Sequence, residues 1–343
     1  MPHVWYNSRV EKNSRGIGVI EALTAGFELV ARRPWVILLP IAVNLLIWLG
    51  PRLSVAHLTE QVAAALRSGV GSQTGQFAEA ALSAASRIAE WGQQSNLFAL
   101  LAVGLPVLAV RTQAQHLWAL DNWTWAVGLA AGILVLGGYL LAVYLGVLGR
   151  RVRGVHESVA RALAHAARVL WRLAALSVVV LGITTVLAIP AMMTVGVLSF
   201  FYPQGAMFLA TLTGWLAIGF LIWVWFYLFF ALDAMVLDDV GVRQAVSRSV
   251  TLVRLNGGAT AGLILLTLTL TWGLGVVWDA MAASTAGTVV AILANAYVST
   301  ALAAASLIFY SSRWRVLEQR IVALAAASGE SAPTTDRANP SGE

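Results

Sequence analysis

The sequence contains no cysteine, and few of its 343 residues carry a charge. The lack of cysteine excludes disulfide bonds, thiolate metal sites and cysteine nucleophiles. Charged residues make up 11% of the chain, whereas soluble domains average about 25%. So few charges cannot coat a soluble protein of this length, and the composition therefore excludes a soluble globular class.

Signatures of the common enzyme classes are also missing. The five histidines lack the HExxH spacing of a zinc protease, and the chain has neither a Walker phosphate loop nor a G-x-S-x-G nucleophile elbow. No chain of intramembrane carboxylates or histidines forms a proton path. We therefore expect a protein that is not an enzyme and that has no catalytic residues, no metal site and no cofactor.

Hydrophobic runs of membrane length are abundant. The chain is 59% hydrophobic, its mean hydropathy is +0.77, and the apolar runs are continuous. A helical span needs about 20 apolar residues, so the sequence predicts an all-α integral membrane protein. We expect six transmembrane helices at about 34–53, 125–148, 174–200, 206–237, 258–279 and 286–311.

Basic residues sort to one side of these spans. Eighteen of the 22 lysines and arginines precede the first span, follow the sixth, or lie in the connections after the second and the fourth. Because cytoplasmic loops of membrane proteins are enriched in Lys and Arg, both termini are expected in the cytoplasm. The same rule accounts for the net charge of +6 without nucleic acid as a partner. Abundant alanine and a single lysine, Lys12, indicate a bacterial source, so the expected location is the bacterial cytoplasmic (inner) membrane.

One short helical pattern occurs three times, each time before an apolar hairpin. The copies begin at Gly18-Val19, Gly154-Val155 and Gly241-Val242, and each places polar residues on one face and apolar residues on the other. We expect three cytoplasmic amphipathic interfacial helices, each preceding a transmembrane hairpin. Their arginines would attract anionic lipid headgroups, and the candidate headgroup contacts are Arg32, Arg33, Arg150, Arg151, Arg153, Arg172 and Arg254.

The first hairpin differs from the other two because an outer-face helical insertion, about 54–124, separates its spans. Residues 54–95 have two amphipathic stripes separated by a glycine-rich break at 69–72, which predicts a helical hairpin. The following apolar segment, Leu97–Val110, is too short to cross and is interpreted as interfacial or re-entrant. The insertion is a candidate surface for a protein partner, a cap over a vestibule, or a packing element.

Polar residues at membrane depth are scarce, and such residues are functional candidates by default. The three candidate intramembrane polar positions are Asn44, Asp233 and Asn295. Interhelical hydrogen bonds explain most such amides. The predicted organisation is an N-terminal cytoplasmic segment with an interfacial helix (1–33), one membrane domain (34–327) and a disordered C-terminal tail (328–343).

The end of the last span carries a recognisable pattern. Tyr310, Arg313, Arg315 and Glu318 follow the spacing Tyr-x-x-Arg-x-Arg-x-x-Glu, and the stretch 236–257 is similar to an internal helix of the same group. In these features the chain resembles multi-span prokaryotic membrane proteins related to the membrane domain associated with glycerophosphoryl diester phosphodiesterases. The resemblance implies six spans with interleaved amphipathic helices. It implies little about function, and it does not extend to a catalytic barrel.

These observations favour a non-enzymatic bacterial inner-membrane protein, a scaffold or accessory subunit that organises membrane lipid or a partner complex. The alternative is a transporter or channel for a small or lipidic substrate, since the kinked spans and internal repeats also occur in transporters. A transporter should have a midplane cavity near Asn44, Pro190 or Asn295, and a scaffold should have a filled core.

Overall fold

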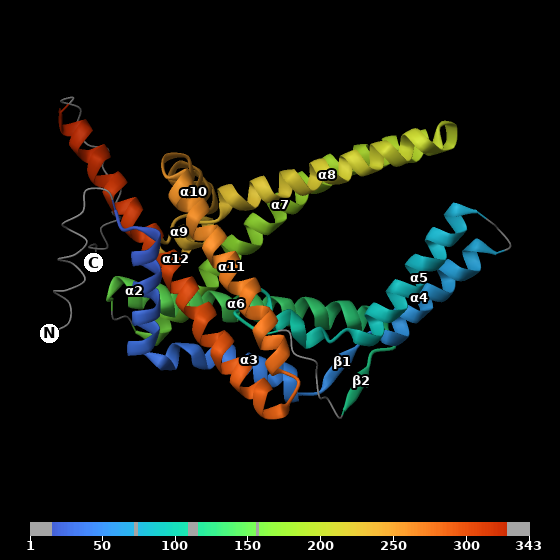
Figure 1. Ribbon diagram of the computed structural model, residues 1–343, viewed down its shortest axis with the longest axis horizontal. Helices are drawn as coiled ribbons and strands as arrows, with labels where there is room; N and C mark the ends of the chain where they lie inside the picture. The colour runs from blue at the N-terminus through green and yellow to red at the C-terminus, as the bar shows by residue number, and fades with distance from the viewer. Residues whose placement is uncertain (1–15, 72–74, 109–115, 156–157, 328–343) are drawn as a thin grey trace, which may run out of the picture.

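The structure, a computed structural model, describes residues 16–71, 75–108, 116–155 and 158–327. Helices dominate these ranges (Figure 1). In chain order the elements are α2 (Val19–Arg32), η1 (Pro34–Ile37), α3 (Leu38–Leu49), β1 (Arg52–Ser54), α4 (Ala56–Val70), α5 (Gln76–Gln94), η2 (Leu97–Ala102), β2 (Leu117–Ala119), α6 (Trp123–Arg153), α7 (Val159–Phe201), α8 (Pro203–Leu228), α9 (Ala231–Asp238), α10 (Val242–Leu255), α11 (Gly257–Met281) and α12 (Thr285–Ala327).

The helices have the length and composition of a multi-span membrane protein. Five of them are long and apolar enough to cross a membrane, or six if α2 and the η1–α3 segment, which meet at a bend of 96°, form one broken span. This finding confirms the all-α membrane class. The exact six-span topology stays a prediction, because α3 has only 12 residues and, at about 1.5 Å per residue, is shorter than a hydrocarbon core of roughly 30 Å.

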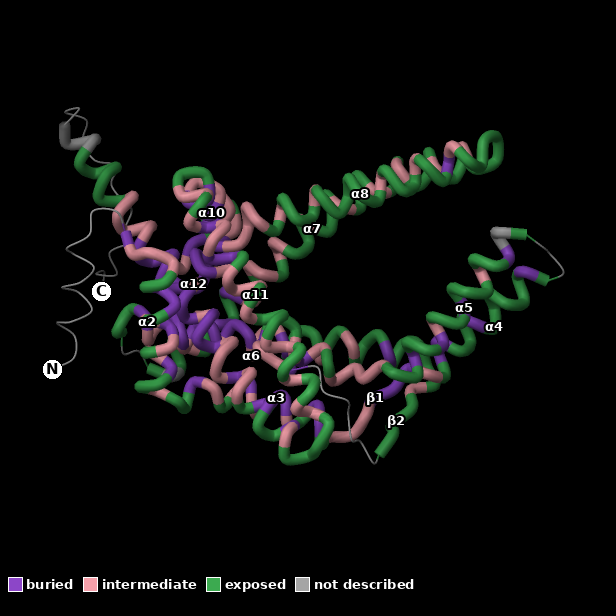
Figure 2. Tube along the Cα trace, viewed as in Figure 1, coloured by how far each residue is buried: buried purple, intermediate pink, exposed green. Residues whose placement is uncertain are grey.

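Two helical hairpins extend from a packed body (Figures 1 and 2). The body holds most of the buried residues, where α2, α6, α9, α10, α11 and α12 meet. Phe230 at the start of α9 and Phe309 and Tyr310 of α12 are fully buried at its centre, and the rings of Phe230 and Phe309 stack with centroids 5.7 Å apart. The α7–α8 and α4–α5 hairpins both point away from α2 and α10.

The α7–α8 hairpin is largely exposed. In the most apolar 18-residue window of α7, no residue is buried against the rest of the protein. Phe200, at the tip of the hairpin, is 86% exposed. An apolar surface of this extent is stable only against hydrocarbon or another apolar partner. The exposure therefore fits a hairpin that is surrounded by lipid.

The three amphipathic helices do not form in the same way. The first and third copies are the separate helices α2 and α10, and Gly18 and Gly241 are their N-caps. The second copy is not a separate helix, because α7 continues without a break from Val159 to Phe201. No glycine or proline interrupts residues 159–181, so nothing in the backbone ends the surface helix before the span begins.

The helix α2 packs more closely than an interfacial helix requires. It lies along α12, and a Cβ added at Gly26 would be 2.4 Å from the carbonyl oxygen of Ala301. At the start of α2, the backbone N–H of Ile17 donates to Ser312 Oγ at 3.0 Å, and Arg313 donates to the Ile17 carbonyl at 3.0 Å. The first and last described helices are therefore fastened to each other.

The predicted fourth span, 206–237, lies within one candidate membrane span, Pro203–Asp238, which consists of α8 and α9. The two helices are separated at Phe229 and Phe230, and Ser249 of α10 bridges the break. Ser249 Oγ accepts from the Phe230 N–H at 3.1 Å and donates to the Tyr227 carbonyl at 2.7 Å. A buried hydroxyl thus satisfies backbone groups that the interruption leaves without helical partners.

The helical insertion of the first hairpin, about 54–124, folds as predicted in its helical part. The helices α4 and α5 pair as a hairpin on either side of the glycine-rich break, and the short strands β1 and β2, which the sequence did not predict, pair in parallel. The segment Leu97–Leu108 begins as η2 and packs on α6 and α3. It is not among the described helices that are long enough to cross a membrane.

The predicted disordered tail, 328–343, and residues 1–15 of the predicted N-terminal segment lie outside the described residues.

Candidate anion-binding pocket

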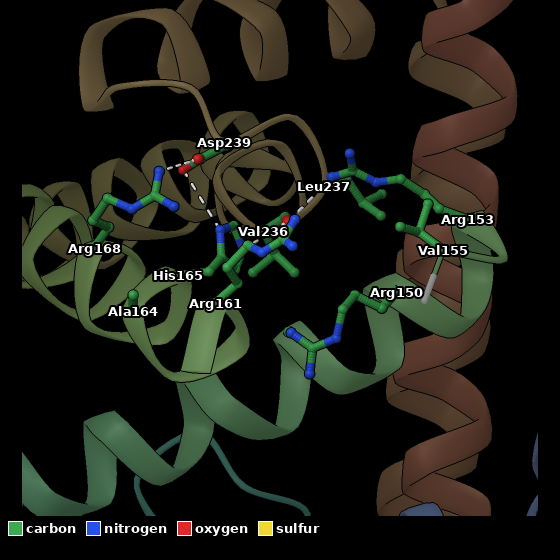
Figure 3. Close-up of a pocket in the computed structure, with 11 residues that line it drawn as sticks. Arg150, Arg153, Val155, Arg161, Ala164, His165, Arg168, Val236, Leu237 and Asp239 are labelled. Atoms are coloured by element: carbon green, nitrogen blue, oxygen red, sulfur yellow. Dashed lines mark hydrogen bonds and ion pairs between the residues drawn. The ribbon is translucent and has the colours of Figure 1, made fainter. Parts of the chain in front are cut away.

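An arginine-rich pocket lies where the end of α6, the first turns of α7 and the end of α9 meet (Figure 3). Its volume is about 210 Å³. The side chains of four arginines and one histidine surround the segment that contains Val236 and Asp239. The lining residues are Gly146, Arg150, Arg153, Val155, Arg161, Ala164, His165, Arg168, Val236, Leu237 and Asp239.

The end of α6 supplies two of the arginines. Arg150 and Arg153 lie in its last turn, where the partial negative charge of the helix C-terminus favours cations. The helix ends at Gly154, whose φ of 70° is left-handed and whose N–H bonds to the Arg150 carbonyl. Glycine is the usual residue at this conformation, so the sequence fixes the position at which α6 stops and its basic last turn faces α7.

The first turns of α7 supply the other two arginines and the histidine. Arg161, His165 and Arg168 are spaced four and three residues apart, which places them on one face of a helix. The structure directs this face at the end of α9 (Figure 3). The polar stripe of the second amphipathic copy is therefore one wall of the pocket.

The end of α9 supplies acceptors for these cations. The carbonyl oxygen of Val236 accepts from Arg153 Nη2 at 3.3 Å and lies 3.1 Å from His165 Nε2. Asp239, the C-cap of α9, has a φ of 52° and is the sole non-glycine residue of the described ranges with a positive φ. Aspartate tolerates this left-handed conformation better than most residues, and the turn brings its carboxylate toward α7.

Asp239 forms ion pairs with two arginines of α7. Its Oδ2 pairs with Arg168, and its Oδ1 pairs with Arg172 at 2.5 Å. His165 Nδ1 lies 3.6 Å from the same Oδ1. These contacts fix the end of α9 against α7 and hold Arg168 at the pocket wall.

The pocket lining is strongly positive. Its described lining residues include four guanidinium groups and one carboxylate, and guanidinium groups bind carboxylate and phosphate oxygens through paired N–H donors. Arg161 is exposed and has no hydrogen bond or ion pair with the residues that the structure describes. Glu157, one turn before it, lies outside the described residues. The arrangement is suited to binding an anion.

A second charged group lies on the other side of the Asp238-Asp239 pair. Asp238 Oδ2 accepts from Arg248 at 2.6 Å and from the hydroxyl of Tyr310 at 2.7 Å. The Arg248 guanidinium also lies 4.7 Å from the ring centroid of Trp314. Burial opposes its charge, but Asp238 and Tyr310 together outweigh burial and raise the Arg248 pKa above its ordinary value. Adjacent aspartates therefore connect α9 to α10 and α12 on one side and to α7 on the other.

The structure divides the predicted headgroup contacts among several places. Arg150 and Arg153 line the pocket, and Arg172 lies behind Asp239. Arg151 is 5.1 Å from the ring centroid of Trp35, and Arg32 pairs with Glu28 on the exposed face of α2. Neither Arg33 at the end of α2 nor Arg254 near the end of α10 lines the pocket.

The three intramembrane polar candidates have structural partners. Asn44 is buried. With its side-chain amide oriented so that both the oxygen and the nitrogen have a partner, it accepts from the Leu108 N–H at 3.0 Å and donates to the Leu108 carbonyl at 3.1 Å. Asn295 donates to the Pro106 carbonyl at 3.3 Å. Asp233 is buried and accepts from Ser306 at 2.6 Å. Two of the three candidates therefore hold the 106–108 segment.

Sequence reasoning did not predict Asp239 as a pocket residue, and it did not name Arg161, His165 or Arg168 as site residues. It suggested only that Asp233, beside Asp238 and Asp239, reaches the membrane interface. The combination of Asp-Asp with a following Val-Gly is a turn signal, and the stripe Arg161, His165 and Arg168 is visible in the sequence. Only the packing of α9 on α7 shows that these two features meet.

Among the described residues no group of three histidine or acidic side chains could hold a metal ion. No known protein family, curated protein or solved structure matches this chain. The resemblance to the phosphodiesterase-associated membrane domain therefore stays a prediction.

Proposed function

We propose that this chain is a non-enzymatic protein of the bacterial inner membrane, with both termini cytoplasmic, that organises anionic lipid as a scaffold or accessory subunit. The observation that carries the proposal is the pocket in which four arginines of α6 and α7 surround the end of α9. Arginines on the cytoplasmic side of membrane helices attract anionic headgroups, at about 1 kcal/mol each near the surface. The resemblance noted in the sequence is consistent with this role.

The packing of the body supports a scaffold. The amides of Asn44 and Asn295, which a transporter would turn toward a midplane cavity, are bonded to the 106–108 segment. Pro190, the third expected position, is exposed on the α7–α8 hairpin and not directed into the body. Fully buried residues such as Phe230 and Leu263 fill the body between the helices.

The outer α4–α5 hairpin is the proposed contact for a protein partner. Apart from its own pairing it has few contacts with the body and projects away from it (Figure 1). Trp91 and Leu82 of α5 are 63% and 46% exposed. In the proposed orientation this hairpin is available on the outer face of the membrane.

Two measurements on the full-length protein test the proposed function. Liposomes that contain the protein should show no flux of small solutes or labelled lipid above that of empty liposomes, and protein extracted in mild detergent should retain anionic lipid in preference to zwitterionic lipid. Substrate-dependent flux that saturates would defeat the scaffold and establish the transporter. Equal retention of zwitterionic and anionic lipid would defeat the lipid role.

A further inference from the structure

We infer that the pocket formed by α6, α7 and α9 is a specific site for a phosphate monoester group, carried either by a lipid headgroup or by a soluble phosphate. The inference rests on the proposed lipid function and assigns a ligand class to one site. Three independent features of the pocket lead to it: its charge, its position along α7 and its size.

The charge of the lining suits a doubly charged ligand. Four guanidinium groups face one carboxylate, and Asp239 is already shared between Arg168 and Arg172. A phosphate monoester carries about −1.5 to −2 charges at neutral pH and three terminal acceptor oxygens. A phosphodiester carries a single charge and two such oxygens. The described lining residues therefore carry more positive charge than a diester can neutralise.

Aromatic residues place the pocket at the level of lipid headgroups. Trp171 is 76% exposed on α7, one turn after Arg168 and so about 5 Å further along the helix axis. Trp35 is 44% exposed and lies under the guanidinium of Arg151, next to Arg150. Exposed tryptophans concentrate at the membrane–water interface. A lipid phosphate at that depth lies beside the pocket.

The size of the pocket accommodates a phosphate group. A volume of about 210 Å³ is room for a phosphate group together with several waters. Gly146 contributes to this space because it has no side chain. A Cβ added there would lie between the pocket residues, 3.7 Å from both Arg150 Nη1 and His165 Cδ2.

Arg161 is the donor that is available to a ligand. It lines the pocket from α7 and is exposed, with no partner in the described part of the chain. Arg168 is fixed by Asp239, and Arg153 bonds to the carbonyl of Val236. Arg161 can therefore turn toward a bound phosphate without breaking an ion pair that the structure shows.

The test uses the full-length protein in detergent and two fluorescent lipids, the monoester phosphatidic acid and the diester phosphatidylglycerol. Arg161→Gln removes the available donor, and Gly146→Leu fills the pocket. Their matched controls are Arg243→Gln, which removes an exposed arginine of α10 outside the pocket, and Gly132→Leu, which adds a side chain on α6 where no atom lies within 4 Å. Unlabelled glycerol 3-phosphate and inorganic phosphate are the soluble competitors.

The expected result is that phosphatidic acid binds more tightly than phosphatidylglycerol, and that Arg161→Gln and Gly146→Leu each weaken it about tenfold or more while the controls change it little. Displacement by glycerol 3-phosphate or inorganic phosphate would identify soluble phosphate as a ligand, and lack of displacement would identify the lipid. Because Arg161 is exposed, its variant remains informative if Gly146→Leu fails to fold.

Equal binding of the two lipids, with equal losses in Arg161→Gln and Arg243→Gln, would overturn the specific site and leave the proposed lipid function intact. No preference of the wild type for either anionic lipid over phosphatidylcholine would defeat both.

Discussion

The carboxylate of Asp239 bridges Arg168 and Arg172, so that one residue at the end of α9 fixes one turn of α7. The bridge depends on the left-handed backbone of Asp239, whose φ is 52°. The bridge packs α9, a short helix of the body, against α7, most of which extends away from the body. Arg168, one of the two arginines in this bridge, is part of the pocket wall.

Replacement of Asp239 by asparagine should strengthen anion binding. Asn also tolerates the left-handed conformation, so the backbone is retained while Arg168 and Arg172 lose their anionic partner. Affinity for phosphatidic acid should rise about tenfold, because the freed arginines can form charge-assisted hydrogen bonds of about 1.5–3 kcal/mol. The measurement is equilibrium binding of the fluorescent lipid to the variant and to the wild type.

The effect of the same change on stability should be small. Asp239 is 37% exposed, and its partners Arg168 and Arg172 are 54% and 20% exposed. Ion pairs of a solvent-exposed carboxylate contribute about 0–1 kcal/mol each. A melting temperature close to that of the wild type, with unchanged or weaker lipid binding, would contradict the view that Asp239 competes with the ligand.

Loss of the Ser249 hydroxyl should destabilise the body. In Ser249→Ala the Phe230 N–H and the Tyr227 carbonyl lose their partner at a site that is fully buried. An unsatisfied buried group costs about 1–3 kcal/mol, so thermal unfolding in detergent should begin at a lower temperature. Ser247→Ala, on the exposed face of the same helix, is the control and should unfold like the wild type. Identical unfolding of both variants would mean that the break between α8 and α9 needs no bridge.

Replacement of Asn44 should release the 106–108 segment. Asn44→Ala removes both hydrogen bonds to the Leu108 backbone, and no water replaces them if this segment lies in the hydrocarbon. The expected loss is about 2 kcal/mol or more. Asn295→Ala removes a half-buried amide with one bond of 3.3 Å to the Pro106 carbonyl and one of 3.4 Å from Ser299 of its own helix, and it should cost less. Hydrogen exchange of the Leu108 amide measures the release. Equal protection of this amide in both variants would mean that Asn44 does not hold the 106–108 segment.

The orientation can be tested because the chain has no cysteine. Ser83→Cys on α5 and Ser247→Cys on α10 both place a thiol at an exposed position. In intact cells a membrane-impermeant thiol reagent should label the first variant only, and after lysis it should label both. Labelling of Ser247→Cys alone in intact cells would reverse the proposed topology.

The sequence predicted the helices with long apolar runs most accurately. The runs 125–148 and 258–279 correspond to α6 and α11, because a continuous apolar run of membrane length seldom forms anything but a transmembrane helix. The interruption at Phe229 and Phe230 was not predictable, since these residues are as apolar as their neighbours and their partner, Ser249, is distant in the sequence. The pairing of β1 with β2 was missed for a similar reason, as 62 residues separate the strands.

The pocket could be predicted only in part. The arginines after the second span and their polar stripe are visible in the sequence, and Arg150 and Arg153 were predicted as headgroup contacts. Asn44 and Asn295 were chosen as candidates because they are the polar residues nearest the centre of the predicted bilayer. Their partners are backbone groups of residues 106–108, which hydropathy and periodicity do not reveal.

The central claim is that the pocket holds a phosphate-bearing ligand, and native mass spectrometry of protein extracted from its own membrane in mild detergent tests it most directly. The wild type should retain a phosphate-bearing lipid or a smaller phosphate ester, Arg161→Gln should lose it, and Arg243→Gln should keep it. Identical adducts on the wild type and on Arg161→Gln, or no adduct on any of the three, would contradict the account.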